Sequence, residues 1–103
     1  MLNELVKFAK ENHPEFAPLP NVYLEKWFLV YKNTTLICRV GGKIMGFALY
    51  QEWPDRLNFI CICGKGNWYE NLQRMLAGSD KLPDKPICFF DEKAHKLRII
   101  QRK

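Results

Sequence analysis

The 103-residue sequence has no apolar run long enough for a membrane-spanning helix or a signal peptide. It also has no low-complexity segment, and its hydrophobic content of 48% and aromatic content of 14% exceed what a disordered chain carries. These absences predict a folded, soluble, cytoplasmic protein without a membrane partner. We expect a single domain over residues 1–103, because a chain of this length supports one hydrophobic core.

The sequence also lacks the ligand spacing of a structural metal site. Cys61 and Cys63 are separated by one apolar residue, and His13 and His95 lie far from them in the chain. We therefore expect no metal. All four cysteines fall within apolar, strand-like runs, where thiols pack as small hydrophobic groups and are inert as nucleophiles. They are Cys38, Cys61, Cys63 and Cys88.

A clustered basic stripe is missing too, although the formal net charge is +5. This excess favours acidic partners such as nucleic acid, phosphorylated cofactors or acidic proteins. Nucleic-acid binding normally needs the basic residues to be clustered on one face. The charge is therefore equally compatible with a protein that binds none of these partners.

The N-terminal third predicts two helices joined by a stiff connector. Apolar residues at helical spacing predict an amphipathic helix over residues 2–12, which Pro14 ends. The following PEFAPLP segment cannot be a regular helix or an inner strand. Residues 21–32 fit either a helix or a strand, and we favour a short helix with Asn21 as its N-cap.

Extended segments dominate the middle of the sequence. TTLICRV and KIMGFALYQEW flank Gly41-Gly42 and predict a hairpin with a two-residue turn. Gly46 lies inside the second strand, where a missing side chain indicates a bulge or the close approach of another backbone or a ligand. Residues 57–63 predict a third strand that is buried in the middle of the sheet, with Phe59, Cys61 and Cys63 on one face.

The last third predicts a helix and two short strands. Asn67 and Glu70 have the spacing of a capping box, and Gly78 is a candidate C-cap. PICFF and KLRII flank DEKAH, which has the length of a hairpin loop. The predicted order is α-α-β-β-β-α-β-β. The fold class is therefore α+β, with a largely antiparallel sheet of about five strands covered by helices.

The junction between the third strand and its helix is the main candidate binding site. It comprises Cys63, Gly64, Lys65, Gly66 and Asn67. A strand that leads through glycines into a helix can bind phosphate, because the first helical N–H groups are unpaired and the helix dipole leaves partial positive charge there. A GxG pattern also occurs where a tight turn needs glycine for steric reasons alone. Both interpretations stay open at this point.

The element order and the segment GKIMGF, residues 42–47, resemble the GNAT family of N-acetyltransferases. In that family the loop after the corresponding buried strand binds the pyrophosphate of acetyl-CoA, so the resemblance implies an acyl-CoA site at Cys63 to Asn67 and acyl transfer to an amine. Gly64 and Gly66 match the two small positions of the family's loop, whereas Cys61 stands where Gln or Arg is expected. The chain is shorter than usual members, and the final helix with its tyrosine general acid has no counterpart.

A different class of function competes with the enzyme. A small non-enzymatic protein, like many short phage-encoded or accessory proteins, could use exposed aromatic and basic residues such as Trp53 and Arg56 to bind a protein, a second copy of itself or nucleic acid. Catalytic residues are not identified by the sequence. The isolated candidates for acid–base chemistry, which no second group at an informative spacing supports, are His13, Glu52, Asp55, Asp91 and His95.

Overall fold

The computed structural model describes residues 2–91 and 94–101. Its elements are α1 (Leu2–Asn12), α2 (Asn21–Val30), the 3-10 turn η1 (Lys32–Thr34), β1 (Thr35–Val40), β2 (Lys43–Glu52), β3 (Leu57–Gly64), α3 (Trp68–Ala77), β4 (Ile87–Asp91) and β5 (Lys96–Ile100). The predicted α+β class and element order are confirmed. Residues 92 and 93 of the predicted DEKAH loop lie outside the described residues.

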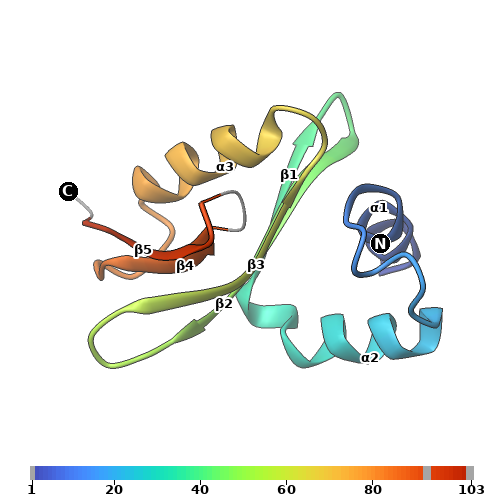
Figure 1. Ribbon diagram of the computed structural model, residues 1–103, viewed down its shortest axis with the longest axis horizontal. Coiled ribbons are helices and arrows are strands. Elements are labelled where there is room, and N and C mark those ends of the chain that lie inside the picture. Colours follow the sequence, from blue (N-terminus) through green and yellow to red (C-terminus); the bar gives the residue numbers. More distant parts are fainter. Residues whose placement is uncertain (1, 92–93, 102–103) are drawn as a thin grey trace.

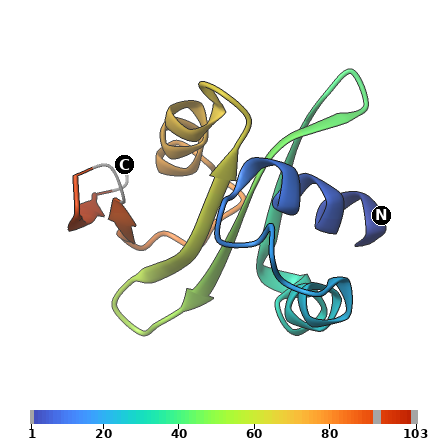
Figure 2. The ribbon, with the colours of Figure 1, turned by 45° about the vertical axis from the view of Figure 1, so that its right-hand side comes forward.

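One five-stranded sheet, in the order β1-β2-β3-β4-β5, organises the molecule. Three neighbouring pairs are antiparallel and β3–β4 is parallel, so the sheet is mixed. Helices α1 and α2 cover one face of β1–β3, whereas α3 lies on the other side and links β3 to β4 (Figures 1 and 2). The sheet thereby separates two buried clusters, one beneath α1 and α2 and one beneath α3.

Residues 21–30 form the predicted helix because their buried side chains repeat at helical spacing. Leu24 and Phe28 are buried four residues apart. Phe28 meets Phe47 of β2 edge to face, with ring centroids 5.4 Å apart. The predicted cap is wrong by one residue: Pro20 occupies the N-cap, and the side-chain oxygen of Asn21 instead accepts a hydrogen bond from Lys10 Nζ at 2.9 Å.

Both predictions for Gly46 are confirmed. The β1–β2 register shifts between Cys38 and Arg39, which leaves Met45 as an extra residue on β2 beside Gly46. A Cβ atom on Gly46 would lie 2.5 Å from Leu72 Cδ1 of α3 and 3.0 Å from the carbonyl oxygen of Cys63. Glycine is needed here because α3 packs directly onto the backbone of β2.

The predicted facing of β3 is wrong, because this strand contains a second bulge. Leu49 pairs with Cys61 and Tyr50 pairs with Phe59, so Ile60 is an extra residue. The insertion reverses the alternation of side chains beyond it. Phe59 consequently faces the cluster under α3, whereas Cys61 and Cys63 face α1 and α2.

Helix α3 begins without the predicted capping box. Asn67 has helical dihedral angles, φ −77° and ψ −1°, and its side chain makes no cap hydrogen bond. The predicted end of the helix is confirmed, since Gly78 is the C-cap and donates its backbone N–H to Arg74 O. Gly41 and Gly42 also form the predicted turn, with φ values of +59° and +80°.

Candidate functional site

The parallel ladder between β3 and β4 is short. It contains only the pairs Leu57–Ile87, Asn58–Cys88 and Phe59–Phe89. The bulge at Ile60 follows at once and bends β3, while β4 diverges from it. β2 pairs with one edge of β3, and β4 pairs with the other edge only as far as Phe59. We call the rest of that second edge, from Ile60 to Gly64, the open edge, because β4 does not pair with it.

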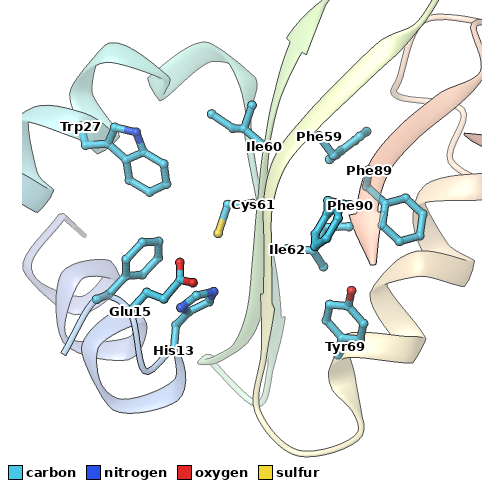
Figure 3. Close-up of a pocket in the computed structure, with 11 residues that line it drawn as sticks. His13, Glu15, Trp27, Phe59, Ile60, Cys61, Ile62, Tyr69, Phe89 and Phe90 are labelled. Atoms are coloured by element: carbon cyan, nitrogen blue, oxygen red, sulfur yellow. The ribbon is translucent and has the colours of Figure 1, made fainter. Parts of the chain in front are cut away.

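A cleft lies along this open edge. It consists of a cavity of about 340 Å³ and a smaller one of about 140 Å³ that share His13, Ile62 and Tyr69 in their linings. The connector between α1 and α2 forms one wall, β4 and α3 form the other, and β3 forms the floor (Figure 3). Trp27 of α2 also lines the larger cavity, so residues from five separate parts of the chain meet at the point where the sheet divides.

The larger cavity is mainly apolar and aromatic. Cys61 and Ile60 point toward α2 and the connector, while Phe59 and Ile62 point toward β4, as the bulge requires (Figure 3). Phe90 of β4 is 54% exposed even though it is a large apolar side chain. The other lining residues are His13, Glu15, Phe16, Trp27, Tyr69 and Phe89.

The turn of Gly64, Lys65 and Gly66, which we call the glycine turn, begins at the smaller cavity. Gly64 is needed there for steric reasons. A Cβ on Gly64 would lie 2.6 Å from the backbone nitrogen of Tyr69, so the tight entry into α3 requires glycine. The Lys65 N–H donates to Met45 O at 3.0 Å, which ties the turn to the bulge of β2. The steric interpretation of Gly64 from the sequence is thereby confirmed.

Gly66 and Asn67 differ from Gly64. Gly66 has φ +60°, and a Cβ placed there would meet no atom within 4 Å. The backbone N–H groups of Gly66 and Asn67 donate to no other described residue. Two adjacent amide donors thus lie beside the exposed Lys65 in an exposed turn at the start of a helix.

The five residues predicted as a binding site are only partly brought together by the cleft. Cys63 and Gly64 line the smaller cavity, and Lys65, Gly66 and Asn67 are exposed just beyond it. The Cys63 side chain is 2% exposed and packs in the cluster under α1 and α2. Its backbone, not its thiol, is what a ligand in the cleft would meet.

Most of the candidate acid–base residues lie in ion pairs or turns away from the cleft. Glu52 pairs with Lys85 at 2.7 Å, and Asp55 pairs with Arg56, whose hydrogen bond lowers the pKa of the Asp55 carboxyl. Asp91 binds Arg98 Nε at 2.8 Å and the Ala94 N–H at 3.2 Å. His95 occupies a turn with φ +52°. None of these four residues lines either cavity.

His13 is the exception, because it lines both cavities and stacks on Phe16 at 4.5 Å between centroids. Sequence reasoning missed Glu15 and Tyr69, which also line the cleft. Tyr69 could have been found, since it follows the glycine turn directly. Glu15 could not, because no periodicity in the proline-rich connector shows which side chains turn inward.

The remaining predictions concern cysteines, metal and membrane. Cys61, Cys63 and Cys88 are buried thiols outside any disulfide among the described residues, as predicted, whereas Cys38 is only half-buried. Within residues 2–91 and 94–101, there is no group of three or more His, Cys, Asp or Glu side chains placed to hold a metal ion. Each helix in that part of the chain is too short and too polar to cross a bilayer.

Trp53 and Arg56, the candidate residues for binding a partner, lie side by side. Trp53 is 41% exposed, and Arg56 Cζ lies 5.8 Å from the centroid of its ring.

No model of a known protein family, no curated protein and no solved structure matches the chain significantly. The geometry and the lining of the cleft are therefore the basis for the function proposed below.

Proposed function

We propose that the cleft along β3 binds an acyl-CoA and that the protein transfers the acyl group to an amine. The observation that carries this proposal is the open edge of β3, which leads along a cavity to a turn where the Gly66 and Asn67 N–H groups are unoccupied by other described residues. The coenzyme's pyrophosphate would lie at that turn, and its pantetheine arm along the strand.

The open strand edge suits an extended chain that contains amide groups. A strand edge with which no neighbouring strand pairs can bind such a chain in the way it would bind an added strand. The edge from Ile60 to Gly64 is about 16 Å long at the usual rise per residue of a strand. Apolar side chains flank it on both sides, which suits the methylene groups of the arm.

The turn supplies positive potential for the pyrophosphate. Lys65 is exposed beside the two amide donors, and the N-terminus of the ten-residue helix α3 begins directly after them. The segment Cys63–Tyr69 contains no acidic residue. His13, which lines both cavities, is placed to accept a proton from an amine that enters the larger cavity.

Charge at position 66 tests the proposal. Gly66→Asp and Gly66→Asn place side chains of equal size in open space, and both residue types tolerate a positive φ. We expect acetyl-CoA to raise the melting temperature of the wild type, because a ligand that binds only the native state stabilises it. Gly66→Asp should abolish this shift, whereas Gly66→Asn should retain much of it.

Calorimetric titration with acetyl-CoA gives the affinities. If the two variants bind acetyl-CoA equally well, the pyrophosphate does not lie at the turn. If the wild type shows no stabilisation at millimolar acetyl-CoA, the coenzyme proposal is wrong.

A specific observation also favours the second candidate function, which is non-enzymatic binding of a protein or of a second copy. Phe90, Leu97 and Ile99 are each more than half exposed. The β4–β5 register places them on one face of the hairpin, because Phe90 pairs with Leu97 and Cys88 pairs with Ile99. Sedimentation equilibrium tests self-association: a dimer that dissociates in Leu97→Lys would support this function.

A further inference from the structure

The larger cavity has the opposite electrostatic character to the protein as a whole. The sequence contains 16 Lys and Arg residues and carries a formal net charge of +5, yet none of the described Lys and Arg residues lines this cavity. Among the described residues its one carboxylate is Glu15, and seven of the eleven that line it have aromatic rings when His13 is included. We propose that this cavity binds the ammonium group of an apolar amine. On the proposed function, from which this extension follows, that amine is the acyl acceptor.

Glu15 is available as the counter-ion of an ammonium group. It forms no ion pair with any other described residue. Its carboxylate lies beside His13 and on the same side of β3 as Trp27 (Figure 3). Glu15 is itself exposed, so water screens its attraction for a cation, and the adjoining aromatic wall must supply part of the binding energy.

The aromatic wall near Glu15 is held in place before any ligand arrives. Trp27 contacts the rings of Phe16, Phe28 and Tyr31 at centroid distances of 5.3, 5.3 and 6.0 Å. Aromatic faces attract cations, and tryptophan does so best. A wall that is already ordered loses little side-chain entropy on binding.

The opposite wall suits the apolar part of the amine. On this wall Phe90 is 54% exposed, and Phe59 and Phe89 are buried. The volume of about 340 Å³ is at the lower end of the range for small-molecule pockets, which fits an arylalkyl amine. A carboxylic acid would meet Glu15 without any basic lining residue to offset the repulsion.

The two ends of the cleft therefore select opposite charges. Gly66, Asn67 and Lys65 suit an anion, whereas Glu15 and the rings suit a cation. A ligand with a diphosphate at one end would lie in one orientation, with its uncharged end toward the amine. This arrangement brings the two substrates together at the boundary that His13, Ile62 and Tyr69 share.

Tryptophan fluorescence can measure amine binding in the absence of any coenzyme, because Trp27 lines the cavity. Three probes of similar shape separate charge from hydrophobicity: 2-phenylethylamine, 2-phenylethanol and phenylacetate. We expect 2-phenylethylamine to bind at least about tenfold more tightly than the alcohol, as a paired and partly desolvated ammonium group should, and phenylacetate to bind least. Equal affinity for the amine and the alcohol would overturn the inference.

Glu15→Gln should remove most of the preference for the amine. The matched control is Glu11→Gln, which makes the same change of charge at an exposed glutamate that does not line this cavity. The control should leave the preference unchanged. Loss of the preference in both variants would show that the net charge of the protein matters, not Glu15, and would contradict the inference.

This experiment fails separately from the coenzyme experiment. If 2-phenylethylamine binds through Glu15 while acetyl-CoA does not bind, the cavity is an amine site and the acyl-transfer proposal is wrong. If acetyl-CoA binds at Gly66 while the amine shows no preference, acyl transfer stands and the proposed class of acceptor is wrong.

Discussion

The sheet consists of two arms that differ in how many residue pairs join their strands. The first arm consists of β1, β2 and β3, which pair through six and seven residue pairs and are covered by α1 and α2. The second arm consists of β4 and β5, which pair through five residue pairs. Helix α3 packs against β2 and β3 of the first arm and links β3 to β4. Only three pairs join β3 to β4. The cleft exists because the sheet is complete within each arm and incomplete between them.

The two bulges show how this incompleteness arises. The bulge at Met45 lies within the first arm, and the carbonyl oxygen of Met45 accepts the Lys65 N–H, so the irregular backbone is used to hold the glycine turn. The bulge at Ile60 lies at the end of the β3–β4 ladder, where it bends the strand and leaves its edge open. One bulge positions the candidate anion site and the other opens the cleft.

Truncation of a phenylalanine in each arm should give the largest contrast. Phe47 is fully buried in the first arm between the rings of Phe8 and Phe28, at 6.1 and 5.4 Å. Phe47→Ala should lower the free energy of unfolding by about 3–5 kcal/mol, because it removes the ring and leaves a cavity. Phe90→Ala removes the same ring from an exposed position of the second arm, and the loss should stay below about 1 kcal/mol.

Urea denaturation measures both losses. If they were equal, the exposed face of the second arm would be covered in solution, which would favour the protein-binding candidate.

Gly46→Ala should cause a smaller loss of unfolding free energy, and it tests how tightly α3 packs on the first arm. Gly46→Ala places a Cβ 2.5 Å from Leu72 Cδ1, which is itself buried, so we expect a loss of about 1–3 kcal/mol from overpacking. The double variant with Leu72→Ala should lose less than the sum of the two single variants, since the shorter side chain relieves the clash. Strict additivity of the unfolding free energies would show that α3 moves away without cost.

Much of the fold could be predicted because it depends on local patterns. The two N-terminal helices, the Gly41-Gly42 turn, the three consecutive strands and the end of α3 at Gly78 follow from periodicity and turn residues. Gly46 was recognisable because a glycine inside a strand leaves a packing site empty. The cap predicted at Asn21 was wrong because Pro20 takes that position, whereas Asn67 is the N-cap of α3 as predicted but its side chain makes no cap hydrogen bond.

The cleft could be predicted only in part. The glycine turn is visible in the sequence, but the bulge at Ile60 is not, because ICIC reads as a regular apolar strand. Without that bulge, Phe59 and Cys61 are assigned to the same face and the ladder with β4 is expected to continue. Glu15 and Trp27 reach the cavity through long-range packing of the connector and α2, which no local pattern encodes.

The smallest expected effect is a pH dependence that belongs to the first arm. Arg39 of β1 binds Glu4 of α1 at 2.7 Å, and its hydrogen bond, followed by its charge, lowers the pKa of the Glu4 carboxyl below the ordinary value of 4.5. A lowered folded-state pKa means that the pair stabilises the fold fully above the unfolded-state value and loses this contribution as the pH falls through the lowered pKa. Because the pair is exposed, the effect should be small and should weaken with salt.

Glu4→Gln removes the titrating group and retains its size. The free energy of unfolding of the wild type should exceed that of the variant near pH 6, and the two should converge as the pH falls below the lowered pKa. Hydrogen exchange should show the loss of protection in α1, which the pair ties to β1, and not in β4 and β5. An equal loss of protection in both arms would mean that the incomplete junction nevertheless couples them into one cooperative unit.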